Sequence, residues 1–134
     1  MEKTIRLAVQ KSGRLSEGSL KLIKECGIHW ANGGRKLKAA ASNFPIEFLF
    51  LRDDDIPGYV ADGIADIGMV GENEVAEKGE EVEIVHRLGF SKCRLSIAIP
   101  KAEEYIGVES LAGRSIATSY PRILGNFLQS KNIK

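Results

Sequence analysis

The feature that most constrains the fold is the alternation of short apolar segments with segments of helical pattern. Residues 5–9, 46–51 and 64–70 have the composition of buried strands. Ser16 is the expected N-cap of a helix with an apolar stripe, and residues 57–63 are expected to form a second, short helix. Strands that alternate with helices favour a mostly parallel sheet with helices on both faces, so the sequence predicts an α/β fold.

The remaining segments extend this pattern and indicate where the first lobe ends. Further elements are expected as strands at 37–41, 82–86, 93–99 and 115–118, and as helices at 72–78 and after residue 118. The charged stretch 101–107, which follows Pro100, is the one break in composition. We therefore expect a first α/β lobe over 1–100 and the start of a second α/β lobe over 101–134.

Composition and charge exclude several classes of protein. The 134-residue chain has a formal net charge of +1, so no strong overall field favours nucleic acid or a membrane surface. No apolar stretch approaches the roughly 20 residues that a membrane-spanning helix needs. Cys26 and Cys93 match no metal-binding or CxxC spacing, and we expect reduced, buried thiols in a cytoplasmic protein.

An arginine and three aspartates follow the strand at 46–51. Open α/β sheets bind ligands beyond the carboxyl ends of their strands, so Arg52, Asp53 and Asp54 are candidate ligand-binding residues. An alternative is that one aspartate caps the helix that contains Pro57, with the others complementing its dipole and Arg52 pairing locally. Neighbouring residues do not all point to one centre, so we expect no dedicated metal site.

Two other strand ends carry candidate binding residues. Lys11 and Arg14 lie between a strand and a helix, where backbone N–H groups and the helix dipole would favour a phosphate. Gly71 and Glu72 follow the strand at 64–70, and the glycine permits close approach of a ligand. The alternatives are an ordinary basic loop in the first case and tight packing with a helix start in the second.

Two candidates lie further along the chain. Arg94 follows Cys93, which has no paired histidine and is therefore not expected to be a nucleophile. Tyr120 precedes Pro121 at an expected helix start, where it could stack on a base. The alternative for this segment is an N-cap with proline in the first turn.

Taken in order, these motifs resemble those of the ATP phosphoribosyltransferases, which catalyse the first step of histidine biosynthesis. The resemblance covers nearly all of the chain. Each motif is weak alone, but their common order is specific: Gln10–Ser16, Leu51–Pro57, Gly68–Asn73, Gly89–Ser96 and Ile116–Pro121.

This resemblance implies a fold and a reaction. The fold would be like that of type II periplasmic binding proteins, with two α/β lobes and substrates in the cleft between them. The reaction would join N1 of ATP to C1 of phosphoribosyl pyrophosphate and release pyrophosphate, with Mg²⁺ and no covalent nucleophile. The expected partners are these substrates and, for the full-length protein, further copies of itself.

The resemblance also implies roles for the candidates. Lys11 and Arg14 would meet phosphates, and Gly71 with Glu72 would line the cleft. The residues that would lie on the nucleotide side or contact nucleotide are Arg52, Asp53, Asp54, Arg94 and Tyr120.

Two family features are expected to lie beyond Lys134. The loop that holds the 5-phosphate of phosphoribosyl pyrophosphate and the regulatory domain of the long form are both downstream in the family. We therefore expect a truncated enzyme whose isolated fragment can be inactive. The match to the Asp-rich and Ser-Tyr-Pro motifs favours the long form. The alternative from another class is a non-catalytic small-molecule-binding or regulatory lobe; a flavodoxin-like module is disfavoured because the acidic cluster follows the wrong strand.

Overall fold

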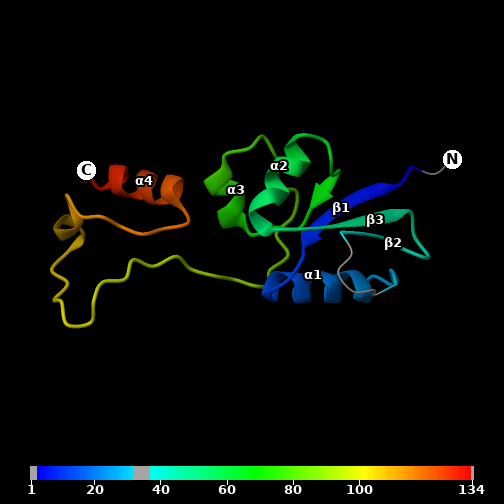
Figure 1. Ribbon diagram of the computed structural model, residues 1–134, viewed down its shortest axis with the longest axis horizontal. Helices are drawn as coiled ribbons and strands as arrows, with labels where there is room; N and C mark the ends of the chain where they lie inside the picture. Colours follow the sequence, from blue (N-terminus) through cyan, green and yellow to red (C-terminus); the bar gives the residue numbers. More distant parts are fainter. Residues whose placement is uncertain (1–2, 32–36, 134) are drawn as a thin grey trace. The chain divides into compact units, whose positions relative to one another are not determined.

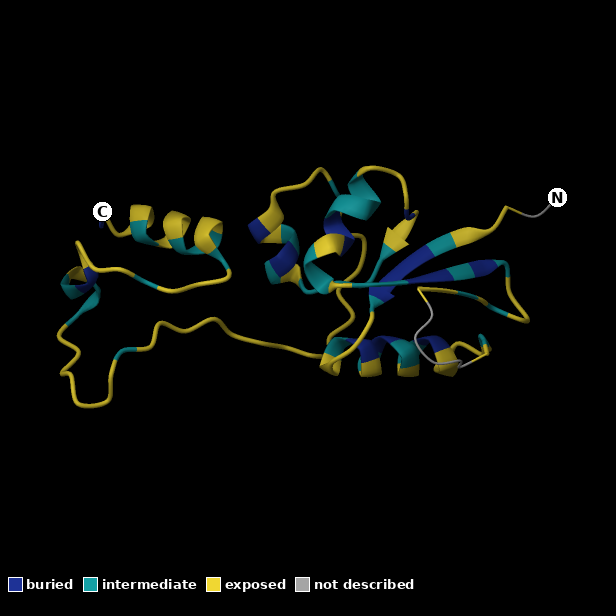
Figure 2. Ribbon diagram, viewed as in Figure 1, coloured by how far each residue is buried: buried dark blue, intermediate teal, exposed yellow. Residues whose placement is uncertain are grey.

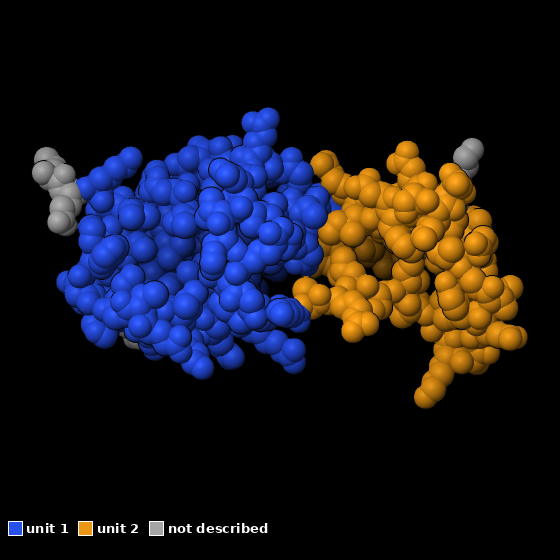
Figure 3. Space-filling view, turned by 180° about the vertical axis from the view of Figure 1, so that it is seen from behind, with its two compact units in different colours: residues 1–92 blue, residues 93–134 orange. Residues whose placement is uncertain are grey.

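The structure is a computed structural model that describes residues 3–31 and 37–133. The chain divides into two compact units, 1–92 and 93–134, which Figure 3 shows in different colours. Each unit is described by itself below. The lobe boundary expected between residues 100 and 101 stays a prediction.

A four-stranded sheet forms the centre of the first unit, and its spatial order is β2-β3-β1-β4 (Figure 1). The strands are β1 (Ile5–Gln10), β2 (Lys38–Ala40), β3 (Ile46–Leu51) and β4 (Ile67–Gly68). Strand β1 pairs in parallel with both β3 and β4, whereas β2 pairs antiparallel with β3 at one edge. The predicted α/β class and the mostly parallel sheet are therefore confirmed.

Helices cover both faces of this sheet, as the sequence predicted. Figure 1 shows α1 (Arg14–Glu25) on one side of the strands and α2 (Ile56–Ala61) with α3 (Glu72–Lys78) on the other. A short 3₁₀ helix, η1 (Asp53–Asp55), connects β3 to α2. Figure 2 shows that buried residues concentrate on β1 and β3, between the helices.

Alternation along the strands divides the core into two clusters. Leu7 and Val9 of β1 join Phe48 of β3 and Ile23 of α1 in one cluster. Ala8, which lies between the two β1 residues, belongs to the other cluster with Leu49 and Ile56. Successive side chains of a strand point to opposite faces, so β1 and β3 supply apolar groups to both helical layers.

The first helix begins earlier than predicted. Gly13, with φ of 98°, directly precedes the first helical residue, Arg14, so the chain turns from β1 into α1 within a few residues. Such a φ is accessible to glycine without the steric penalty of a side chain. Ser16 is therefore a buried residue inside the helix, and its prediction as the N-cap is wrong.

The strands predicted at 82–86, 93–99 and 115–118 are absent from the described structure. Their apolar residues are substantially exposed; Val85, for example, is 71% accessible. A strand exists through hydrogen bonds to a neighbouring strand, and none of these segments takes part in a ladder. Alternation in sequence predicted their strand character, but a strand assignment also depends on a pairing partner.

The second unit contains a 3₁₀ helix, η2 (Val108–Leu111), and helix α4 (Pro121–Ser130). Helix α4 confirms the helix predicted after residue 118, and Pro121 occupies its first turn as expected. Cys93 of this unit and Cys26 of the first unit are both free but exposed, so the predicted burial of the thiols is wrong. In residues 3–31 and 37–133, no helix combines the length and apolarity that crossing a membrane requires.

Gly68 allows α2 to pack closely on β4. A Cβ atom at this position would lie 2.7 Å from Cγ2 of the fully buried Ile56 and 3.1 Å from Cγ2 of Val60. Replacing Gly68 with alanine should therefore lower the free energy of unfolding by about 1–3 kcal/mol, the usual result of overpacking. Urea denaturation followed by circular dichroism measures the change.

The matched control is Gly58, which lies within α2. A Cβ atom there would meet only Oε1 of Glu80 at 3.8 Å, an ordinary contact. Alanine is the better helix former by about 0.5–1 kcal/mol, so Gly58→Ala should stabilise the unit. Equal effects of the two substitutions would show that Gly68 has no special packing role.

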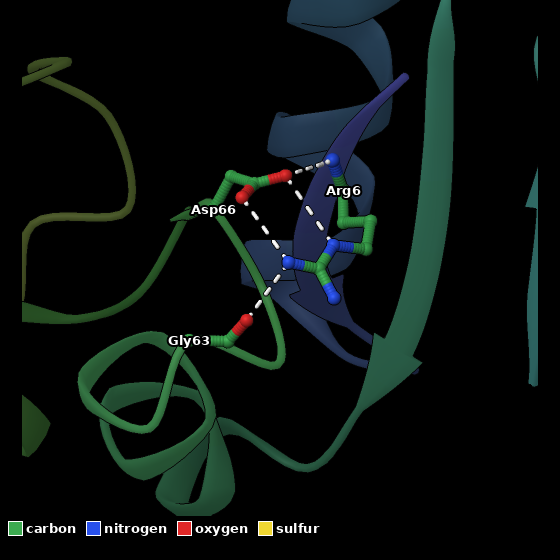
Figure 4. A network of polar contacts seen from close by, with 3 residues as sticks. All are labelled: Arg6, Gly63 and Asp66. Carbon is green, nitrogen blue, oxygen red and sulfur yellow. Dashed lines mark hydrogen bonds and ion pairs between the residues drawn. The ribbon is translucent and has the colours of Figure 1, made fainter. Parts of the chain in front are cut away.

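A polar network secures the start of β4 to β1 (Figure 4). The carboxylate of Asp66 accepts the backbone N–H of Arg6 at 2.8 Å and two guanidinium N–H groups at 3.4 and 3.3 Å. The same guanidinium donates to the carbonyl oxygen of Gly63 at 2.8 Å. These bonds, with the side-chain bond from Arg6 foremost, lower the pKa of Asp66 below its ordinary value of 3.8.

This lowered pKa predicts a pH dependence of stability. Because the carboxylate is favoured in the folded state, its contribution is present above pH 3.8 and is lost as the pH falls through the folded pKa. The difference in unfolding free energy between wild type and Asp66→Asn should therefore be larger at pH 6 than near pH 3. Urea denaturation at both pH values tests this, with the exposed Asp62→Asn as control. A pH-independent difference would contradict the assignment.

Candidate functional site

The carboxyl ends of the three parallel strands, β1, β3 and β4, lie at the same end of the sheet. This end is called the carboxyl edge. Gln10 at the end of β1 is in register with Leu51 at the end of β3, and Ala8 is in register with Gly68 of β4. The pairing continues past the strands, because the N–H of Lys11 donates to the Leu51 oxygen at 2.7 Å. The loops that follow these strands therefore leave the sheet at the same edge.

Lys11 and Arg14 lie at this edge, and both side chains are exposed. Lys11 immediately follows β1, and Arg14 is the first residue of α1. Cations near the N-terminus of a helix are unfavourable because the helix dipole is positive there. Helix stability therefore does not explain this pair, whereas an anionic ligand would be attracted by both cations and by the free N–H groups of the first turn.

The residues after β3 form a local charge cluster. Nε of Arg52 lies 3.3 Å from Oδ1 of Asp54, and Nη2 donates to Oδ2 at 3.4 Å, which confirms the expected local pairing. Oδ1 of Asp53 accepts the N–H of Asp54 at 3.0 Å. Asp55 makes no side-chain capping bond to α2, so the prediction that one of the aspartates caps this helix is wrong at that position.

Asp54 is incompletely satisfied within this cluster. Its Oδ1 atom is inaccessible to solvent and has no aligned hydrogen bond among the described residues, although Arg52 lies within ion-pair distance of the same atom. The two observations are compatible, because an ion pair requires proximity and a hydrogen bond also requires alignment. The Oδ1 atom of Asp54 is therefore held near the Arg52 cation without an aligned donor.

Gly71 and Glu72 occupy the same edge after β4. Gly71 has an extended conformation directly before α3, and Glu72 is the first residue of that helix. Arg87 binds the Glu72 carboxylate side-on, through Nε to Oε2 at 3.1 Å and Nη2 to Oε1 at 2.9 Å. This hydrogen-bonded pair lowers the pKa of Glu72 and raises the pKa of Arg87.

The other two candidates belong to the second unit, 93–134. Arg94 lies on its irregular first segment and is exposed. Tyr120 is half-buried and precedes α4, and its N–H donates to Oγ1 of Thr118 at 2.9 Å. The structure thus places seven candidates at one edge of the first unit and two in the second: Lys11, Arg14, Arg52, Asp53, Asp54, Gly71 and Glu72, then Arg94 and Tyr120.

The donor set does not form a resident metal centre. Across the described ranges, no group of three or more His, Cys, Asp or Glu side chains is placed to hold a metal ion. Asp54 instead pairs with Arg52, and Asp53 accepts the backbone N–H of Asp54. These residues therefore do not provide a protein-only site for Mg²⁺, which prefers octahedral oxygen coordination.

Sequence reasoning missed Arg87 as part of this edge. Arg87 lies 15 residues after Glu72 on a segment for which the sequence predicted a neighbouring strand. Its charge was visible, but no spacing rule connects a helix start with a residue so far along an irregular segment. The buried carboxylates Glu74 and Glu77 on α3 were also unforeseen.

The fold and this edge define an α/β domain with a basic helix start after one parallel strand and an acidic cluster after the next. The family model described as "HisG: ATP phosphoribosyltransferase" matches residues 52–134, which is more than half of the chain. The chain therefore belongs to the ATP phosphoribosyltransferase family.

Individual relatives agree with this assignment. The ATP phosphoribosyltransferase of Cytophaga hutchinsonii is 64% identical over 134 residues, covering 100% of this chain and 47% of the relative. That of Parabacteroides distasonis is 57% identical over 130 residues, covering 97% of this chain and 46% of the relative. The chain thus spans about half the length of these relatives.

A solved structure supports the fold. A chain of the ATP phosphoribosyl transferase (HisG:HisZ) complex from Thermotoga maritima has a TM-score of 0.60, with 97% of this chain and 61% of that chain covered. The sequence identity is 20%, so this likeness concerns the fold alone.

Proposed function

We propose that the chain provides the first lobe and the start of the second lobe of an enzyme that transfers the phosphoribosyl group of phosphoribosyl pyrophosphate to N1 of ATP. The observation that carries the proposal is the 64% identity to the Cytophaga hutchinsonii relative over all 134 residues. The gathering of charged candidates at one sheet edge supports it independently. The wider architecture we propose is that of type II periplasmic binding proteins.

The proposed reaction is a substitution at C1 of the ribose. The N1–C1 bond forms, the bond from C1 to the pyrophosphate oxygen breaks, and the bonding electrons leave with pyrophosphate. Positive charge develops at C1 and negative charge on the leaving group. The protein therefore needs to orient two substrates and stabilise an anion, and it needs no covalent nucleophile.

In this scheme the cations after β1 bind phosphates. Lys11 and Arg14 are exposed beside the first turn of α1, where N–H groups lacking helical partners add to their attraction. Arginine can donate two parallel hydrogen bonds to phosphate oxygens, so Arg14 would orient the group while Lys11 supplies charge.

The acidic loop and the helix start after β4 would contact donor groups of the nucleotide. Arg52, Asp53 and Asp54 shape this side, and Gly71 with Glu72 lines the cleft. We assign Arg94 and Tyr120 of the second unit to nucleotide contacts by residue type, as a cation for phosphate and a ring for stacking.

Three further properties complete the proposal. Mg²⁺ commonly binds through substrate phosphates with few protein ligands, so we propose that it enters with the substrates. We propose a cytoplasmic location and assembly of the full-length protein as a homo-oligomer, in its long form.

A chimera tests the function directly. This chain would replace the matching segment of the Cytophaga hutchinsonii relative, whose other half supplies the remaining sequence. Purified chimera and unaltered relative would be assayed for pyrophosphate release with ATP, phosphoribosyl pyrophosphate and Mg²⁺. We expect turnover within about tenfold of the relative.

Two results would contradict the proposal. A folded chimera that binds ATP but never releases pyrophosphate would favour a non-catalytic binding or regulatory lobe. A folded chimera that binds neither substrate would reject both functions. Circular dichroism of the chimera and the relative separates either result from misfolding.

A further inference from the structure

The side-on pair of Arg87 and Glu72 connects an irregular segment to the carboxyl edge. Glu72 begins α3 directly after Gly71, whereas Arg87 comes from the segment 79–92. Two nitrogens of one guanidinium each bind a different carboxylate oxygen, at 3.1 and 2.9 Å. Such a two-bond contact fixes the orientation of the carboxylate as well as its position.

Stability does not account for this pair. The Arg87 side chain is 71% exposed and the Glu72 side chain 59% exposed. Ion pairs in such surroundings contribute little to the free energy of folding, because water and salt screen them. What distinguishes this pair from other exposed pairs is its place, because Glu72 begins α3 at the carboxyl edge.

The segment that carries Arg87 is itself attached to the domain. The Phe90 ring packs on α1 at Gly18, where a Cβ atom would lie only 2.6 Å from Cε2 of the ring. Only two residues separate Phe90 from Arg87, so this contact limits where the guanidinium can reach. The segment thus contacts the helix after β1 through Phe90 and the helix after β4 through Arg87.

The geometry leaves Glu72 able to bind a ligand. An ionised carboxylate has about four lone-pair positions, and the side-on pair uses one on each oxygen. The other positions remain able to accept O–H or N–H donors. Because Arg87 also lowers the pKa of Glu72, the carboxylate remains an acceptor at lower pH than an unpaired glutamate would.

We propose that Arg87 is a positioning residue that holds the Glu72 carboxylate ready to accept hydrogen bonds from hydroxyl groups of the nucleotide ribose. This assignment rests on the proposed function of the same site. Arg87 acts through Glu72 and has no separate contact with the nucleotide.

A double-mutant cycle in the chimera tests this dependence. Glu72→Gln and Arg87→Gln should each lower kcat/KM for ATP by about tenfold, which corresponds to the loss of one charge-assisted hydrogen bond. The double variant should be no worse than Glu72→Gln alone, because Arg87 has nothing left to position. Arg87→Lys should recover only part of the loss, since an ammonium cannot bind side-on.

The second unit offers a matched control. Arg114 binds Glu103 through two nitrogens and two oxygens, and both side chains are partly exposed, at 41% and 39%. Arg114→Gln should leave kcat/KM unchanged. An equal loss from Arg114→Gln would mean that the Arg87 effect reflects general loss of a surface pair, and would overturn the proposal.

Other results distinguish failure of this inference from failure of the proposed function. The positioning role would be overturned if the losses of kcat/KM in the two single variants multiplied in the double variant, or if Arg87→Gln left kcat/KM unchanged. Either result would leave the proposed function standing. An inactive chimera would contradict the proposed function and the positioning role together.

NMR titration of the 134-residue chain examines the pair alone: Arg87→Gln should raise the pKa of Glu72, and an unchanged pKa would refute the pairing.

Discussion

Replacing Arg14 with alanine should lower kcat/KM of the chimera by about 100-fold, at the lower end of losses seen when one preorganised donor to a developing anion is removed. Arg14 is exposed at the first position of α1 and faces the unfavourable end of the helix dipole. Its removal should therefore leave the free energy of unfolding unchanged or slightly increased. Steady-state kinetics and urea denaturation of the same preparation measure both quantities.

Lys21 supplies the control for this prediction. It is an exposed cation on the same helix, farther from the carboxyl edge. Lys21→Ala should change neither kcat/KM nor the affinity for ATP. An Arg14→Ala variant with full affinity and activity would refute the phosphate-binding role, and equal losses from both variants would indicate a general effect of positive charge.

The largest expected effect on stability is that of Phe48→Ala. Phe48 is fully buried on β3, and its ring centroid lies 4.9 Å from that of Trp30 and 6.3 Å from that of Phe50. Deleting the ring removes apolar burial and leaves a cavity in the cluster that also contains Ile23 of α1. The free energy of unfolding should fall by about 3–5 kcal/mol.

A second phenylalanine tests whether burial is the cause. Phe44 lies two residues before β3 but is 48% exposed, so Phe44→Ala should change stability by no more than about 0.5 kcal/mol. Phe48→Leu, which keeps more apolar volume, should destabilise less than Phe48→Ala and keeps the comparison measurable if the alanine variant unfolds. Similar losses at positions 44 and 48 would contradict the assignment of the core.

Local sequence signals predicted an element well where terminating residues flank it on both sides. The predicted bounds of β3 (Ile46–Leu51) and α3 (Glu72–Lys78) match the structure. Both have strong markers at their ends: Pro45 and Arg52 flank the strand, and Gly71 and Gly79 flank the helix. In each case the residue pattern of the element and the residues that terminate it indicate the same bounds.

Prediction failed where local hydrogen bonds at a helix end redirected the chain. The strand predicted over 64–70 is reduced to Ile67–Gly68, and it loses its start because the N–H groups of Ile64 and Ala65 both donate to the Tyr59 oxygen at 3.0 Å. These residues complete the end of α2 and are unavailable to the sheet. Apolar composition alone cannot distinguish these two uses of the same residues.

The candidate site was predictable in its location but not in its internal contacts. Topology places Lys11, Arg52 and Gly71 after parallel strands, so their common edge follows from the sequence of elements. The pairing of Glu72 with Arg87 depends on how an irregular segment docks, and periodicity gives no information about that. Arg94 and Tyr120 stay predictions, since they belong to the other unit.

The most direct test of the central claim is an NMR titration of the 134-residue chain with ATP. The account predicts that amide shifts change at the carboxyl edge, in residues 11–14, 52–54 and 71–72. Amides at the opposite edge, around Arg6 and Asp66, should remain unperturbed and serve as an internal control. Absence of any change at high ATP concentration, or changes confined to that opposite edge, would contradict the claim that the loops after β1, β3 and β4 form the substrate site.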